Sequence, residues 1–192
     1  MAHVTIFGTG NMANAIGGVF AEGGSSVTYI SAEESGTAPI VGDIVVLAVP
    51  YPAVAGILSA YGEQLAGKTV VDITNPLNFE TFDSLVVPAG SSAAAEIQAA
   101  LPQSSVVKAF NTTFAATLVA KTVGGAPTTV QVAGDSAEAK SALIAAIAAG
   151  GVQAIDAGAL SRAHELEALG FLQLTLAVRE AISWTGGFAV VR

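Results

Sequence analysis

The sequence contains no cysteine and few charged residues. The absence of cysteine excludes disulfides, thiol catalysis and cysteine-based metal sites. Only 7 of the 192 residues are Lys or Arg, against 15 Asp or Glu, and the basic residues form no cluster. Because nucleic acid binding requires cations that neutralise phosphates, a chain of formal net charge −8 is not expected to bind nucleic acid.

Long apolar runs are also lacking. No stretch approaches the roughly 18 consecutive apolar residues that a membrane-spanning helix requires. The first seven residues have neither the basic region nor the apolar run of a secretory signal. We therefore expect no membrane contact and a cytoplasmic location. No cluster of His and carboxylate residues has metal-ligand spacing, so no metal site is predicted.

Small and apolar residues are abundant instead. Hydrophobic residues make up 52% of the chain, and 21 residues are glycine. This composition is typical of closely packed helices and strands, and the length suffices for one well-buried core. We expect a single domain over residues 1–192.

Apolar segments with strand and helix character alternate along this domain, which favours an α/β fold with a doubly wound, mainly parallel sheet. Residues 31–43 are too few and too polar for a full crossover helix, so a loop or single turn is expected there. Strands are predicted over 4–7, 27–30, 44–49, 69–73, 105–110, 128–133 and 152–155, and helices over 11–21, 53–65, 92–101, 136–149 and about 160–184.

A glycine-rich turn lies between the first predicted strand and the first predicted helix, the context that a dinucleotide-binding fingerprint requires. In this interpretation Gly8 permits the tight turn, Gly10 lets the backbone approach a diphosphate, and Ala13 allows close helix packing. Free N–H groups at the helix start would hold the diphosphate. The pattern predicts a Rossmann-type fold with a cofactor site that begins at Gly8, Thr9, Gly10, Asn11 and Met12.

The residue at the end of the second strand bears on the choice between NAD and NADP. An acid there would hydrogen-bond the ribose hydroxyls and select NAD, but this position holds Ser31. A serine can donate to a 2′-phosphate, which favours NADP. However, Glu33 and Glu34 follow in place of Arg or Lys, and carboxylates beside a phosphate repel it unless they point away. NADP is the expected cofactor and NAD the alternative.

Three further segments follow predicted strands at the carboxyl edge of the sheet, where ligands of open parallel sheets bind. Asn75 and Asn111 are candidates to hold the nicotinamide ribose or its carboxamide; the alternative is that each caps its own turn. The candidate residues of these segments are Ala48, Val49, Pro50 and Tyr51, then Asn75, Pro76 and Leu77, and then Ala109 and Asn111.

No proton donor stands out, and no catalytic residue is assigned. Lys108 lies inside a predicted strand, and the role of Tyr51 is open. Arg162, His164, Glu165 and Glu167 are interpreted as a polar helix face. Hydride exchange between two redox cofactors needs positioning more than acid–base help, so a chain with few acid–base groups fits that reaction.

The order of four motifs resembles the NADPH-dependent reductases of the deazaflavin coenzyme F420 and the related bacterial dinucleotide-binding oxidoreductases. The motifs are 8–12, 48–51, 72–77 and 108–112, and the resemblance extends over nearly the whole chain. It implies NADP bound along the first three motifs, with its nicotinamide near Asn75 and Asn111. A second carrier of deazaflavin or flavin type would then stack on the nicotinamide.

Two alternatives remain open. Residues 10–16 also resemble the start of pyrroline-5-carboxylate reductases, so an imine reductase is a distant alternative. A non-catalytic NAD(P)H-binding sensor is the other, because such a module needs only the diphosphate loop.

The last predicted helix is apolar on several faces, which indicates burial against both the sheet and a partner subunit. We therefore expect a homodimer of C2 symmetry.

Overall fold

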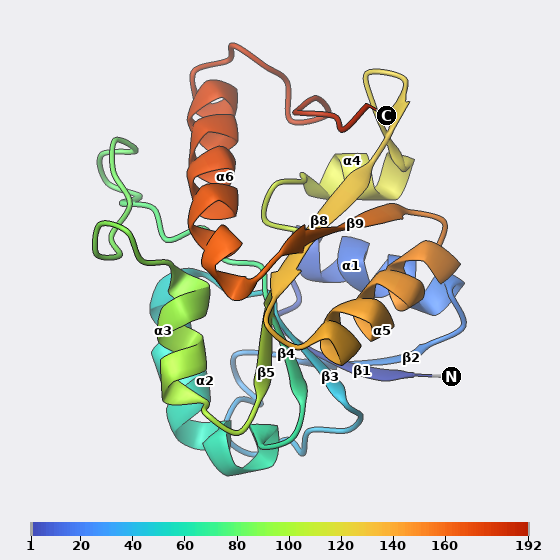
Figure 1. The fold of residues 1–192 in the computed structure, drawn as a ribbon, viewed down its shortest axis with the longest axis vertical. Helices are drawn as coiled ribbons and strands as arrows, with labels where there is room; N and C mark the ends of the chain where they lie inside the picture. The colour runs from blue at the N-terminus through green and yellow to red at the C-terminus, as the bar shows by residue number, and fades with distance from the viewer. Residues whose placement is uncertain (1, 192) are drawn as a thin grey trace.

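The computed structural model describes residues 2–191, in which a twisted seven-stranded sheet has the order β2-β1-β3-β4-β5-β8-β9 (Figure 1). All neighbouring pairs are parallel except β5 and β8. The predicted α/β class with a mainly parallel sheet is therefore confirmed. The strands are β1 (His3–Phe7), β2 (Ser26–Ile30), β3 (Ile44–Leu47), β4 (Thr69–Asp72), β5 (Ser105–Lys108), β8 (Thr129–Gly134) and β9 (Gln153–Gly158).

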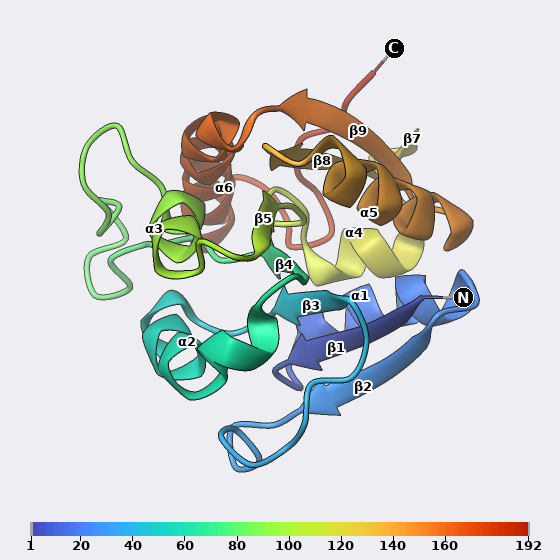
Figure 2. The same ribbon diagram turned by 60° about the horizontal axis from the view of Figure 1, so that its bottom comes forward.

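Helices cover both faces of the sheet (Figure 2). One face carries α1, α4 and α5, and the other carries α2, α3 and α6. A small hairpin, β6 (Thr122–Val123) with β7 (Ala126–Pro127), follows α4. The helices are α1 (Asn11–Glu22), α2 (Tyr51–Leu65), α3 (Ala93–Ala100), α4 (Ala115–Ala120), α5 (Ala137–Ala149) and α6 (Ala163–Val178), the last preceded by a 3-10 turn, η1 (Leu160–Arg162). Among residues 2–191, no helix combines the length and apolar character that crossing a membrane requires.

Two apolar layers hold the helices on the sheet. The central strands are buried on both faces, so alternate residues enter opposite layers. In β3, Ile44 and Val46 join the layer beneath α1 and α5, whereas Val45 and Leu47 join the layer beneath α2 and α3. This double burial explains why the strand reads as a continuous apolar run in the sequence.

The ends of several elements differ from the prediction. The final helix stops at Val178 rather than near Trp184, because the chain turns there and Glu180 adopts a positive φ of 59°. Helix α4 and the β6–β7 hairpin were not predicted. Ser136 caps α5 by accepting from the Ala139 N–H, and the neighbouring Asp135 accepts from the Leu160 N–H.

Residues 31–43 cross from β2 to β3 as turns without a helix or strand, as predicted. The crossing segment is fixed to the body of the domain by two side chains. The buried Tyr61 hydroxyl accepts from the Gly36 N–H at 2.8 Å, and the Thr5 hydroxyl accepts from the Val41 N–H at 3.1 Å. The short crossing therefore has a defined path beside β1 and α2.

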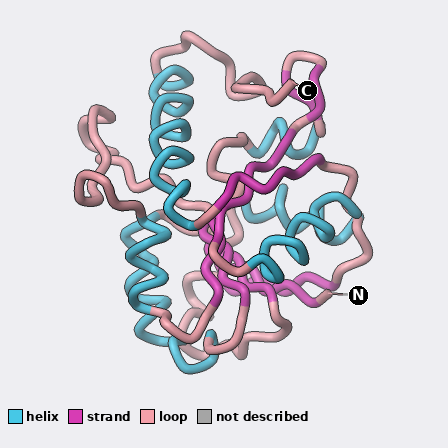
Figure 3. The backbone as a smooth tube through the Cα atoms, viewed as in Figure 1, coloured by secondary structure: helices cyan, strands magenta, loops and turns pink. Residues whose placement is uncertain are grey.

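A longer loop, residues 73–92, separates β4 from α3 and projects from the domain in Figure 3. It folds back on itself, since Leu77 and Leu85 form an isolated antiparallel bridge. The Asn78 side chain also accepts from the N–H groups of Glu80 and Thr81. This loop adds a wall beside the carboxyl ends of β3 and β4.

A buried ion cluster joins four elements below that wall. The Lys108 ammonium at the end of β5 donates to Asp72 of β4 and to Glu167 of α6, both at 2.8 Å, and to the Thr74 carbonyl at 2.6 Å. Glu167 also accepts from the Ala93 N–H at the start of α3. Burial raises the pKa of Glu167, while the charge of Lys108 opposes that rise.

We expect Lys108→Met to lower the free energy of unfolding by about 3–5 kcal/mol, because it leaves two buried carboxylates without their cation. The matched control is Lys121→Met. Lys121 pairs with Glu22 on the surface, so its loss should cost less than about 1 kcal/mol. Urea unfolding of both variants measures the difference. Equal losses would contradict a special role for the buried cluster.

Candidate functional site

The crevice at the carboxyl edge of the sheet lies between β1 and β3. Strand β2 lies on one side of β1, whereas β3 and β4 extend the sheet on the other side. This reversal of strand order is the switch point at which α/β sheets bind ligands. The turn after β1 and the turn after β3 therefore face each other across the crevice.

Gly8 is required by the local geometry of that crevice. Its φ is +109°, a conformation that favours glycine, and a Cβ would collide with the Ala48 carbonyl. The Gly8 N–H donates to Ile30 of β2, and the Ala48 N–H donates to Phe7 of β1. These bonds hold the turn between its two neighbouring strands.

Gly10 has a different role, since its backbone is ordinary and a Cβ would meet nothing within 4 Å. It is the N-cap of α1, where no side chain caps the helix. The Asn14 side chain donates to the Thr9 carbonyl at 3.0 Å and fixes the turn from behind. The open space in front of Gly10 and the uncapped helix start form a cradle for an anionic group.

Three adjoining cavities run along the crevice and share lining residues. The turn cavity, of about 540 Å³, lies beside the glycine turn and the end of β2. It meets the middle cavity, of about 340 Å³, at Gly10, Ala48, Val49 and Pro50. The middle cavity meets the end cavity, of about 400 Å³, at Asn11, Met12, Ile73, Asn75 and Leu174.

The turn cavity ends at Ser31, as the spacing predicted. The Ser31 N–H and hydroxyl donate to the Glu34 carboxylate at 3.0 and 2.7 Å. These two hydrogen bonds hold the pKa of the Glu34 carboxyl below its usual value. Glu34 is one of the two carboxylates that were expected to repel a 2′-phosphate, and its side chain points at Ser31.

Asn75 and Asn111 meet between the middle and end cavities. The Asn75 side chain donates to the Asn111 carbonyl, and the Asn111 side chain donates to Asn75 and to the Leu166 carbonyl, at 2.8–2.9 Å. Because one amide nitrogen serves both acceptors, the orientation of Asn111 is determined. Its Oδ1 is buried and has no partner among the described residues.

Gly170 lets α6 pack directly on this asparagine pair, since a Cβ there would collide with the Asn75 side chain. The end cavity is then closed by aromatic side chains. Phe114 and Trp184 pack with ring centroids 5.0 Å apart. Neither ring is among the predicted site residues, since Trp184 was predicted to end the last helix and instead lies in the irregular segment after α6.

Pro76, Leu77 and Ala109 are buried behind the crevice. Leu77 supports the 73–92 loop through its bridge to Leu85, and the Ala109 N–H donates to the Asp72 carbonyl. In the part of the chain that the structure describes, none of the three lines the cavities. Their role as cofactor contacts remains a prediction.

Tyr51 lines the middle cavity at the first turn of α2. Its hydroxyl donates to the carboxylate of Glu96 on α3. Burial, together with that hydrogen bond, raises the pKa of Tyr51, so the hydroxyl stays protonated through the alkaline range. Tyr51 is therefore a neutral hydrogen-bond donor beside the cavity.

The predicted polar helix face at the start of α6 is correct for three of its four residues. Arg162, His164 and Glu165 are exposed and paired at the surface. For Glu167 the prediction was wrong, because this side chain is fully buried and binds Lys108.

The described residues 2–191 contain no group of His, Asp and Glu suited to a metal ion.

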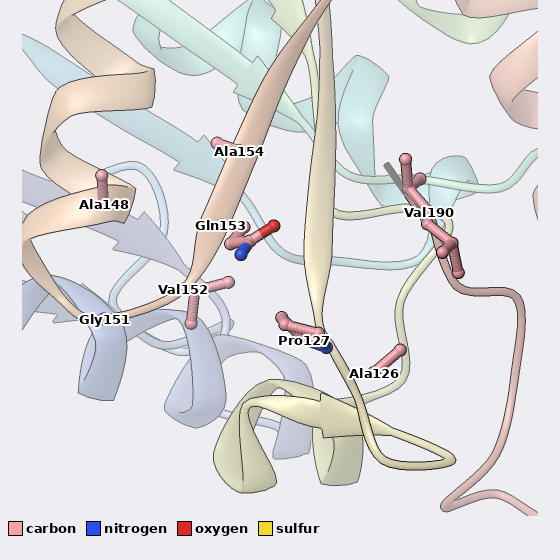
Figure 4. Close-up of a pocket in the computed structure, with 9 residues that line it drawn as sticks. Ala126, Pro127, Ala148, Gly151, Val152, Gln153, Ala154 and Val190 are labelled. Carbon is pink, nitrogen blue, oxygen red and sulfur yellow. The ribbon is translucent and has the colours of Figure 1, made fainter.

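A larger cavity lies elsewhere, beside β7, β9 and the C-terminal segment (Figure 4). Its volume is about 630 Å³, and its lining consists of Ala, Gly, Val, Pro and Gln side chains. No titratable side chain lines it among the described residues. The cavities of the crevice are each smaller, but they adjoin the glycine turn at the switch point of the sheet and are therefore the better site.

Comparison with known proteins supports this assignment. A curated F420-dependent NADP reductase from Methanocaldococcus jannaschii is 33% identical over 149 residues, which cover 76% of this chain and 66% of the relative. A solved structure from Arthrobacter sp. FB24, provisionally assigned as an F420-dependent NADP reductase, has a TM-score of 0.85 and 24% identity, with full coverage of both chains. No family model matches the chain.

A more distant solved structure has the same fold. Pyrroline carboxylate reductase from Plasmodium falciparum, crystallised with NADP bound, matches with a TM-score of 0.61 and 12% identity. The match covers 93% of this chain and 67% of that one. The glycine turn, the crevice and the shared fold together define a protein of the Rossmann dinucleotide-binding class.

Within that class, the chain is similar in sequence to a coenzyme F420-dependent NADP reductase, the family that its motifs resemble. The chain spans 66% of the length of the curated relative that it matches.

We expect Gly10→Ala to weaken NADPH binding by about tenfold or more, because its methyl group would enter the space where the diphosphate approaches. The fold should tolerate the change within about 1 kcal/mol, as the backbone there is ordinary. Gly18→Ala, in the same helix, should leave binding unchanged. Titration calorimetry and thermal unfolding measure both effects. Unchanged affinity in Gly10→Ala would contradict the cradle.

Proposed function

We propose that the protein transfers hydride between NADP(H) and a second redox carrier of deazaflavin or flavin type, or a small-molecule acceptor. The observation that carries this proposal is the chain of three cavities that begins at the glycine turn and ends at aromatic side chains. Residues 1–192 act as one dinucleotide-binding unit in this proposal. When bound, the nicotinamide supplies or accepts the hydride.

The residues present fit a dinucleotide. Gly8, Thr9, Gly10, Asn11 and Met12 would hold the diphosphate with backbone N–H groups at the start of α1. The turn cavity suits the adenosine half, since its walls are apolar and Ser31 closes it. Ala48, Val49, Pro50 and Tyr51 form the opposite wall of the crevice.

The asparagine pair fits the nicotinamide half. Asn111 presents an amide oxygen without a partner among the described residues, and Asn75 lines both cavities at this point. A carboxamide has the N–H groups that such an oxygen accepts. The bonds from Asn111 to Asn75 and Leu166 would keep this oxygen in place.

The end cavity fits a planar apolar ring. Phe114 and Trp184 offer flat surfaces at one end, and Met12 and Ile73 line the side toward the crevice. Aromatic rings prefer offset or tilted packing against such surfaces. A deazaflavin or flavin ring is the second carrier that this lining supports.

A small imine or carbonyl acceptor is the second candidate, and Tyr51 is the observation that favours it. Reduction of these acceptors requires a proton as well as a hydride. The Tyr51 hydroxyl remains protonated and lies at the middle cavity beside Glu96. Because the hydroxyl has a single hydrogen, it would turn from Glu96 to donate to the acceptor atom.

A homodimer is the proposed assembly. The outer side of α6 and the segment after it expose large apolar side chains, namely Leu172, Val178, Trp184 and Phe188. Exposed apolar residues that gather in one region mark interaction sites. A second copy of this chain related by a twofold axis would cover them.

We expect the protein to oxidise NADPH with at least one acceptor from a panel of deazaflavin, flavin, ferric chelates and imines. The absorbance of NADPH measures the rate. Tyr51→Phe should leave flavin-type turnover within about threefold but lower imine turnover by about a hundredfold, the effect of losing a proton donor. Tight NADPH binding without turnover of any acceptor would instead support the sensor.

Sedimentation should give a mass of twice the 19.0 kDa of one chain at micromolar concentration. Leu172→Glu should yield monomers, because Leu172 is 49% exposed on α6 and would be buried in the dimer. Val119→Glu is the control, since Val119 is 72% exposed on α4 and lies beside α1. A monomeric wild type would contradict the proposed assembly.

A further inference from the structure

We propose that Glu34 is a specificity residue that lowers the affinity for a 2′-phosphate and thereby narrows the preference for NADPH over NADH. This inference rests on the dinucleotide function proposed above. It assigns a role to a carboxylate that follows the second strand by four residues, outside the strand-end position where an acid usually selects NAD.

The Glu34 carboxylate already occupies the donors that a phosphate would use. The Ser31 N–H and hydroxyl both donate to the same Glu34 oxygen, at 3.0 and 2.7 Å. Ser31, Ala32 and Ser35 line the turn cavity, so this contact lies at the ribose end of the proposed site. A 2′-phosphate could bind Ser31 only after displacing the carboxylate.

The backbone at Glu34 is fixed, so that displacement must come from the side chain alone. The Glu34 carbonyl accepts from the N–H groups of Thr37 and Ala38, both at 3.1 Å, and from the Thr37 hydroxyl. The next turn is tied to the buried Tyr61 through the Gly36 N–H. The Glu34 side chain is exposed and rotates freely once its bonds to Ser31 break.

The surrounding charge adds to the cost of bringing in a phosphate. No Lys, Arg or His is among the described residues that line the turn cavity. The neighbouring Glu33 carboxylate is exposed to solvent, which screens its charge. Lys68 lies at the other end of the crossing segment, where it donates to the Gly42 carbonyl. The Glu34 carboxylate therefore faces a phosphate without a compensating cation in the lining of the turn cavity.

A ribose hydroxyl meets the opposite situation. A carboxylate offers about four acceptor sites, so Glu34 can accept from a 2′-hydroxyl while it keeps both bonds from Ser31. The same side chain that opposes the phosphate therefore favours the ribose of NADH. Discrimination between the two cofactors arises from this pair of effects.

The test measures the dissociation constants of NADPH and NADH for the wild type and for Glu34→Gln. We expect the substitution to raise the affinity for NADPH relative to NADH by about tenfold, because a neutral amide holds Ser31 less strongly and does not repel a phosphate. Glu33→Gln is the matched control. It removes the same charge one residue away, has no bond to Ser31 in the structure, and should change the ratio by less than about twofold.

A double substitution separates displacement from general charge. If the phosphate takes over the Ser31 donors, adding Ser31→Ala to Glu34→Gln should remove most of the gained NADPH affinity. Equal gains in Glu34→Gln and Glu33→Gln, or an unchanged ratio in both, would overturn the inference while leaving dinucleotide binding intact. Failure of the wild type and all variants to bind either dinucleotide would overturn the proposed function and this inference with it.

Discussion

The contact of Lys108 with two buried carboxylates is the interaction on which the arrangement of the site depends. One ammonium group connects β4 to α6 and, through Glu167, to the start of α3. It also holds the Thr74 carbonyl, directly before the asparagine that lines the crevice. A buried charge is tolerated only when its partners are in place, so the cluster permits one docking of α6. That docking brings Gly170 against Asn75 and closes the end cavity.

The crevice consequently has two parts with different physical support. The glycine turn depends on local backbone geometry, since the φ of Gly8 and the absence of its side chain let β1 and β3 approach. The asparagine end depends on long-range contacts, because Asn111 reaches both Asn75 and the Leu166 carbonyl of α6. In the proposed function, the first part would hold the diphosphate, as glycine turns of Rossmann folds do. The second part would position the nicotinamide, and it depends on the packing of α6 in this chain.

This division explains how much the sequence could predict. The strand at Ile44–Leu47 and the turn at Gly8 follow from local patterns, namely an apolar run and a glycine motif in its strand–helix context. Helix α4 escaped prediction because it has only six residues and no side-chain cap. Glu167 was assigned to the surface because its partner Lys108 is 59 residues away, and periodicity carries no information about such a pair. Trp184 escaped because irregular segments have no periodic signal.

The irregular segment after Val178 carries a consequence for how such proteins diversify. It places Trp184 against Phe114, so one wall of the end cavity comes from a stretch without helix or strand. Segments of this kind accept insertions and deletions that the sheet and the buried cluster would not tolerate. Under the proposed function, a change in this segment would alter which acceptor fits the end cavity while the glycine turn and its neighbouring strands stay the same.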